Sequence, residues 1–164
     1  MTVTNLLEEL LVTTDNSFFL NKITTKAMNY EIIDNPAYTD CVKIGIYLNP
    51  DCECLRLFFS SLEINYFTKY IYSVINRESF GGNEFTFLQF YDKMYSEDRE
   101  ELNMSNDDIY NTALSCECIL KEKDFVEIFI DYTKRLLEVY SDSMNLNKNW
   151  VTDLRDGINK LKDN

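Results

Sequence analysis

The residues with the most recognisable chemistry in this chain of 164 residues are five cysteines, four of which form two C-x-C pairs, Cys52 with Cys54 and Cys116 with Cys118. Four thiolates can hold zinc, but structural zinc sites usually separate paired ligands by two to four residues rather than one. Side chains two residues apart on a helix point about 200° away from each other, and we expect a helix around Cys116. The odd number of cysteines also argues against a secreted disulfide framework. We therefore expect reduced, mostly buried thiols, with no metal and no other cofactor.

The sequence contains no histidine, the commonest general acid–base group and metal ligand. Its absence excludes Ser-His-Asp and Cys-His catalysis and histidine-containing zinc sites. The adjacent carboxylates Glu100 and Glu101 would point apart on a helix, without the burial that a catalytic acid needs. Gly81-Gly82 lacks the further glycines and the lysine of a phosphate loop, so we expect a simple turn there. The sequence thus predicts a protein that is not an enzyme.

The charge balance indicates which partners the chain can bind. Lys and Arg number 16 against 28 Asp and Glu, which gives a net charge of −12 and an isoelectric point near 4.4. Nucleic-acid phosphates and anionic lipid surfaces repel such a chain. A basic protein is attracted to it and associates faster. We therefore expect a basic protein partner, and neither direct nucleic-acid binding nor membrane binding.

The acidic residues are densest between positions 92 and 108. Seven carboxylates there face two cations, Lys93 and Arg99, which leaves a local net charge of −5. Tyrosines from the neighbouring aromatic-rich stretch 58–95 could supply contact area, because tyrosine tolerates half-exposed sites and is enriched at interfaces. The stretch is either a docking face or a solvated surface whose last acids serve a helix N-terminus. The predicted partner-binding residues are Tyr72, Tyr91, Asp92, Tyr95, Glu97, Asp98, Glu100, Glu101, Asp107 and Asp108.

Hydrophobic periodicity and capping residues predict a mostly helical chain. The expected helices cover residues 4–13, 16–30, 61–76, 86–102, 105–121, 124–140 and 149–161. A strand over 83–90 is an alternative to the start of the fourth of these helices.

One β-hairpin is expected over residues 41–60. Apolar residues alternate from Val42 to Leu48, and a second alternating run, Leu55, Leu57 and Phe59, follows the turn-forming Asn-Pro-Asp at 49–51. The predicted hairpin pairs residues 41–48 with 53–60.

These elements predict an α+β fold, predominantly helical, with one hairpin packed on helices; an all-α bundle is the alternative. Neither a linker nor a repeat divides the chain, so residues 1–164 are expected to form a single domain. No leader or membrane-spanning window is found, which predicts a soluble, cytoplasmic protein.

Charge and the lack of catalytic groups favour an inhibitor or immunity-type protein that neutralises a basic partner, such as a nucleic-acid-cleaving toxin, by electrostatic occlusion of its active site. The alternative hypothesis is an all-helical, virus-type host-interaction module that binds an amphipathic helix in an apolar groove.

Overall fold

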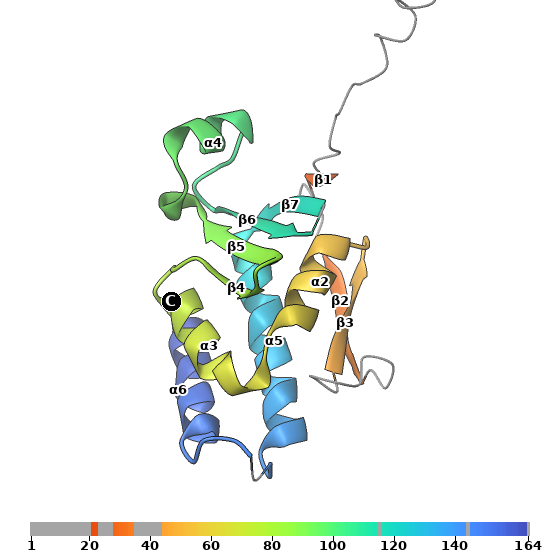
Figure 1. Ribbon diagram of the computed structural model, residues 1–164, viewed down its shortest axis with the longest axis vertical. Coiled ribbons are helices and arrows are strands. Elements are labelled where there is room, and N and C mark those ends of the chain that lie inside the picture. The colour runs from red at the N-terminus through yellow and green to blue at the C-terminus, as the bar shows by residue number, and fades with distance from the viewer. Residues whose placement is uncertain (1–20, 23–27, 35–43, 115, 144, 164) are drawn as a thin grey trace, which may run out of the picture.

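The computed structural model describes residues 21–22, 28–34, 44–114, 116–143 and 145–163, and these residues form two β-sheets and five α-helices (Figure 1). The strands are β1 (Asn21–Lys22), β2 (Asn29–Asp34), β3 (Ile44–Asn49), β4 (Phe80–Asn83), β5 (Thr86–Phe90), β6 (Asp108–Ala113) and β7 (Cys116–Lys121). The helices are α2 (Glu53–Ser61), α3 (Phe67–Ile75), α4 (Ser96–Glu101), α5 (Glu122–Tyr140) and α6 (Trp150–Asp163), with 3-10 turns η1 (Ile64–Tyr66) and η2 (Tyr91–Lys93). The α+β class is confirmed, whereas the single hairpin and the all-α alternative are wrong. The single domain stays a prediction.

The larger sheet has five strands in the order β1-β7-β6-β5-β4. Its neighbours are antiparallel except β1, which runs parallel to β7 and places Asn21 beside Cys118. Because side chains alternate along a strand, one face carries buried residues such as Leu88, Phe90 and Ile109. The other face carries Phe87, which is 41% exposed. The sheet therefore has one face packed against the core.

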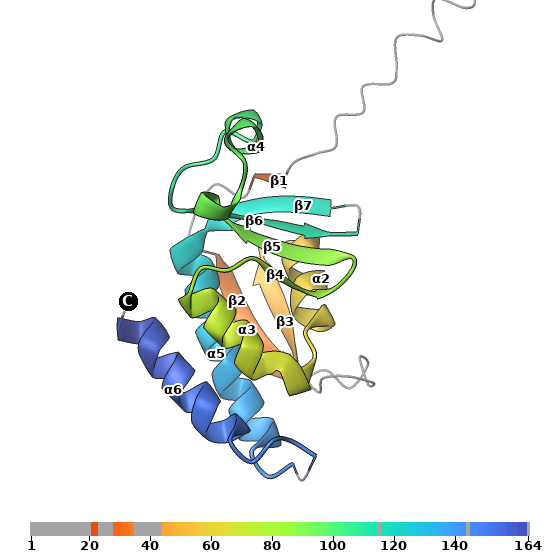
Figure 2. The same cartoon turned by 60° about the vertical axis from the view of Figure 1, so that its left-hand side comes forward.

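Helices α2 and α5 pack against the buried face of the larger sheet. Helices α3 and α6 lie farther from that sheet, and α6 packs on α3 and α5 (Figures 1 and 2). The rings that meet there form the aromatic layer, defined by Phe58, Phe59, Phe67, Phe80, Phe125, Phe129 and Tyr132. Phe59 is central, because its ring lies 4.7 Å from that of Tyr132 and within 6.2 Å of Phe58, Phe125 and Phe129. Edge-to-face and tilted ring pairs of this kind add to the free energy gained by burial.

The expected hairpin over 41–60 is wrong in its second half. The first strand exists as β3, but its partner is β2, with Ile32 opposite Ile46. Residues 53–61 form α2 instead. Leu55, Phe58, Phe59 and Leu62 recur at the helical spacing i, i+3, i+4 and i+7, and all four are buried. Burial of this stripe outweighed the shorter alternation that suggested a strand.

The helices expected over 86–102 and 105–121 are also wrong for most of their length. Residues 86–90 are β5, the alternative considered for that segment, and only 96–101 are helical. Residues 108–113 and 116–121 form the antiparallel pair β6–β7. Ile109 and Ala113 lie four residues apart, a spacing that fits one face of a strand as well as one face of a helix. The Ser105 backbone N–H does donate to the Asp108 carboxylate at 2.7 Å, but this bond closes a turn that leads into β6.

Gly81 and Gly82 do not form a turn but lie in β4. A Cβ on Gly82 would lie 2.3 Å from the carbonyl oxygen of Ser61, so glycine lets the strand approach the end of α2. The single helix expected over 61–76 is replaced by the end of α2, the turn η1 and α3.

The two helices expected over 124–140 and 149–161 are confirmed as α5 and α6. The indole N–H of Trp150 donates to the carbonyl oxygen of Ile64 at 3.0 Å, across 86 positions of sequence. A Cβ on Gly157 would lie 2.7 Å from Ile71, so α6 packs very closely on α3.

The remaining predictions concern the start of the chain. The helix expected over 4–13 lies outside the described residues. The helix expected over 16–30 is wrong where it can be compared, because residues 21–22 and 29–30 lie in strands.

Candidate functional site

The α4 lobe, which we define as residues 91–107, leaves the sheet at the end of β5 and returns to it at β6. It projects from the larger sheet at one end of the molecule, whereas the C-terminal half of α5 lies toward the other end (Figures 1 and 2). Met94 is buried at its base. Most of the predicted partner-binding residues therefore lie on one projecting segment.

Helix α4 has only six residues, and none of its side chains is buried. Glu97 and Asp98 occupy its first turn, where negative side chains complement the helix dipole. Asn103 follows the helix with φ 49°, and the N–H of Met104 donates to the carbonyl oxygen of Arg99 at 3.0 Å. Asparagine tolerates this left-handed conformation, which ends many helices. Local capping, rather than burial, holds the helix.

Four of the seven predicted carboxylates are exposed on α4: Glu97, Asp98, Glu100 and Glu101. None of the four forms an ion pair with any residue in the described part of the chain. Hydrogen bonds from its own backbone N–H and from the Ser96 hydroxyl, at 3.0 Å, lower the pKa of Glu97. Tyr95, directly before the helix, is 78% exposed. The lobe therefore presents negative charge beside an exposed ring.

The other three predicted carboxylates are paired within the molecule. Asp92 forms an ion pair with Arg77 at 3.2 Å and Lys93 at 3.6 Å. Partial burial acts to raise the pKa of Asp92, but the hydrogen bond and charge of Arg77 outweigh it and lower that pKa. Lys121 pairs with Asp107 at 2.8 Å and with the buried Asp108 at 2.6 Å.

The bonds between Lys121 and the two aspartates shift the pKa values of Asp107 and Lys121. The hydrogen bond from Lys121 lowers the pKa of Asp107, and the bonds to Asp107 and Asp108 raise the pKa of Lys121. Asp92 thus ties the start of the lobe to Arg77, which follows α3, and Asp107 and Asp108 tie its end to β7; all three contribute little outward charge.

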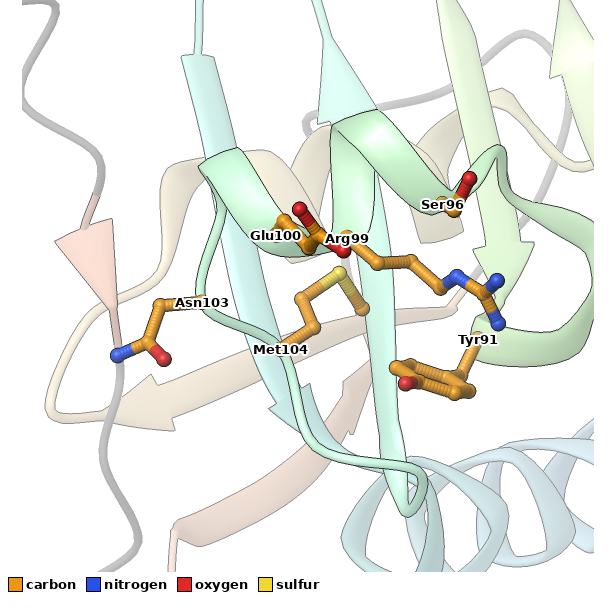
Figure 3. A pocket seen from close by; sticks show the side chains of 6 residues that line it. All are labelled: Tyr91, Ser96, Arg99, Glu100, Asn103 and Met104. Atoms are coloured by element: carbon orange, nitrogen blue, oxygen red, sulfur yellow. The ribbon is translucent and has the colours of Figure 1, made fainter.

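The surface of the lobe has a hollow of about 300 Å³ that is open to solvent. It is lined by Tyr91, Ser96, Arg99, Glu100, Asn103 and Met104 (Figure 3). The Arg99 guanidinium lies over the Tyr91 ring, with its carbon 4.6 Å from the ring centre. This cation–π contact fixes a positive group at the rim. Arg99 and Glu100 give the hollow one positive and one negative side chain.

The predicted tyrosines do not gather in one patch. Tyr91 and Tyr95 belong to the lobe, but Tyr72 lies on α3, on the other side of the sheet from α4 (Figure 1). There the Lys160 ammonium lies 5.0 Å from the centre of the Tyr72 ring. Tyr72 therefore does not join the acidic surface.

An exposed apolar surface was missed by the sequence analysis. Phe85 is 55% exposed and Leu114 is 67% exposed, and the Leu114 N–H donates to the Phe85 carbonyl oxygen at 2.8 Å. Phe87 belongs to the helix expected over 86–102, but it lies on the outer face of β5. The signal was present in the sequence, because apolar residues at 85, 87, 88 and 90 supply both faces of a strand.

The two cysteine pairs meet, contrary to expectation. Cys54 and Cys116 form a disulfide, so the expectation of reduced thiols is wrong for this pair. Cys52 and Cys118 are free and buried, as expected. The described residues contain no group of three or more His, Cys, Asp or Glu side chains placed to hold a metal ion.

Comparisons with known proteins return no relative: no family model, no curated protein and no solved structure matches the chain. Among the helices in the described part of the chain, none combines the length and the apolar character needed to cross a membrane.

Proposed function

We propose that this chain is a binding protein that neutralises a basic protein, in the manner of an immunity protein that inhibits a nucleic-acid-cleaving toxin. The observation that carries the proposal is the set of four exposed carboxylates on α4 without ion pairs to described residues. A cleft that binds nucleic acid is lined with Lys and Arg, so it complements this surface. We place the interaction in the cytoplasm.

The proposed mechanism is occlusion without chemistry. The negative lobe attracts the cationic cleft and raises the association rate. The carboxylates of Glu97, Asp98, Glu100 and Glu101 then pair with the lysines and arginines that would otherwise hold phosphates. Tyr95 supplies contact area at the edge of this surface, because a tyrosine gives a large interface at low entropic cost.

The amphipathic-helix module is not retained as a second candidate. It required an all-helical fold, whereas the described residues include two sheets.

The experiment measures binding to a panel of purified basic nucleases by surface plasmon resonance at about 50 and 500 mM NaCl. We expect a nuclease in the panel to bind and to lose its activity, with an association rate that falls steeply with salt. Amide substitution of the four α4 carboxylates should weaken that binding by about tenfold or more. The variant is E97Q/D98N/E100Q/E101Q.

A matched control changes the net charge equally while leaving α4 intact. It carries amides at four exposed carboxylates elsewhere, E63Q/D142N/D156N/D163N, and should bind almost as the unchanged protein does. Equal weakening by both variants would show that only the overall charge matters. Salt-independent binding that is lost on Phe85→Ala would place the interface on the exposed apolar surface around Phe85 and Leu114 and overturn the proposal.

A further inference from the structure

Four cysteines lie together where the N-terminus of α2 meets β7. Cys52 directly precedes α2 in an extended conformation, with φ −127° and ψ 94°, and Cys54 lies in the first turn of the helix. Cys116 and Cys118 are two residues apart on β7, so both side chains lie on the same face of the strand. The disulfide between Cys54 and Cys116 already joins the two elements.

Cys52 and Cys118 remain as thiols beside that disulfide. Cys52 is 5% exposed and Cys118 is fully buried. Their interaction lowers the pKa of Cys52 and raises that of Cys118, and each thiol lies two residues from one half of the Cys54–Cys116 bridge. The Cys118 S–H donates to the amide oxygen of Asn111 at 3.7 Å. Cys52 is therefore the more nucleophilic sulfur, and Cys118 is next to it.

We propose that Cys52 and Cys118 form an oxidation site at which a hydroperoxide closes a second disulfide between α2 and β7, beside Cys54–Cys116. In the first step the Cys52 thiolate attacks one peroxide oxygen, the O–O bond breaks, and the products are a Cys52 sulfenic acid and hydroxide or alkoxide. In the second step the Cys118 sulfur attacks the Cys52 sulfur and displaces its hydroxyl group, and the Cys118 proton leaves with that group as water. The two thiols are oxidised by two electrons in all, and the peroxide is reduced to water or to water and an alcohol.

Burial determines which oxidant fits. A hydroperoxide is small enough to reach the sulfur of Cys52, a residue that is 5% exposed. A bulky disulfide would need α2 and β7 to move apart. Cys52 and Cys118 lie on the two elements that the Cys54–Cys116 bridge holds together, so Cys118 is placed to capture the sulfenic acid before a second peroxide can oxidise it further. Cys54 and Cys116 are committed to their own bridge and leave two thiols in this cluster of described residues, too few for a thiolate metal site.

The test counts thiols in denaturant before and after treatment with a small excess of hydrogen peroxide. Five cysteines with one bridge give three thiols per chain, and we expect one after treatment. Glu53 separates Cys52 from Cys54, and Glu117 separates Cys116 from Cys118. A glutamate-specific protease therefore cuts within each pair, and mass spectrometry of the unreduced digest should find Cys52 linked to Cys118.

Two variants identify the steps. In Cys118→Ser the Cys52 sulfenic acid has no partner, so dimedone should trap it. The matched control Cys41→Ser should start with two thiols and end with none. Three thiols after peroxide, links within each C-x-C pair, or separate sulfinic acids at Cys52 and Cys118 would each overturn the proposal. One zinc ion retained by the fully reduced protein would overturn it as well, because the cluster would then be a metal site.

Discussion

The aromatic layer and the α4 lobe come largely from one stretch of sequence, residues 58–108, yet they use it in opposite ways. In the layer, rings from α2, α3, α5 and β4 contact one another out of water. In the lobe, α4 buries no side chain and exposes four carboxylates. Stability and the proposed binding are therefore carried by different residues, so substitutions can alter the stability of the fold without altering the proposed interface, and the reverse.

The strongest way to break the aromatic layer is Phe59→Ala. The ring is 1% exposed and contacts four others, so its removal leaves a cavity and should lower the free energy of unfolding by about 3–5 kcal/mol. Urea denaturation measures the change. Phe85→Ala, in the turn between β4 and β5 where the side chain is exposed, should change it by less than about 0.5 kcal/mol; equal effects would contradict the assignment of Phe59 to the core.

The junction between the two regions is tested by Asp108→Ala. The carboxylate is buried and accepts hydrogen bonds from the Ser105 N–H and from Lys121. Its loss leaves the Ser105 N–H unpaired and leaves Lys121 with Asp107 alone, and should cost about 2 kcal/mol of unfolding free energy. The neighbouring Asp107→Ala, at an exposed position, is the control and should leave the urea midpoint unchanged. An unchanged urea midpoint for Asp108→Ala would show that the stability of the protein does not depend on the pair of Asp108 and Lys121.

The aromatic layer contains one buried polar atom whose effect on stability can be measured separately. The Tyr132 hydroxyl is buried without a hydrogen-bond partner among the described residues. Tyr132→Phe keeps the ring and removes that atom, so it should raise the free energy of unfolding by about 1 kcal/mol at neutral pH.

The same residue predicts a pH dependence. Burial raises the pKa of Tyr132 above the usual value of 10.0, and so the folded state favours the neutral phenol. Above the ordinary pKa the unfolded chain ionises while the folded chain does not, so stability is present below pH 10 and is lost as the pH rises beyond it. Tyr132→Phe should make that loss less steep in urea titrations between pH 9 and 11. An unchanged slope would assign the alkaline loss to other tyrosines.

The smallest effect on stability is expected in the lobe. The variant E97Q/D98N/E100Q/E101Q changes only exposed side chains without ion pairs to described residues, and its thermal midpoint should match that of the unchanged protein. Surface changes away from special contacts rarely alter stability. A clear loss of midpoint would show that α4 supports the fold as well as the proposed interface.

The sequence predicted the elements that have a long, regular pattern. Phe125, Ile128, Phe129, Tyr132 and Leu136 repeat over several turns and are all buried in α5. Short segments were ambiguous, because an apolar pair four residues apart, as at 109 and 113, lies on one face of a helix or of a strand. Only the pairing with β5 and β7 decides between them, and that pairing depends on residues far away in the sequence.

The acidic surface was predictable in part. Charge density identified residues 92–108, but it could not distinguish Glu97, which is exposed, from Asp108, which is buried against Lys121. That distinction depends on β7, which brings Lys121 to the base of the lobe. The meeting of the two C-x-C pairs was missed because it needs Cys116 and Cys118 on a strand.

The bond between Trp150 and Ile64 has a consequence for biosynthesis. A ribosome releases residues in order, so the apolar side of α3 stays uncovered until a helix 86 positions later has emerged. During that interval the nascent chain exposes rings that a chaperone could bind. Folding of this half of the protein is therefore expected to wait until α6 has emerged.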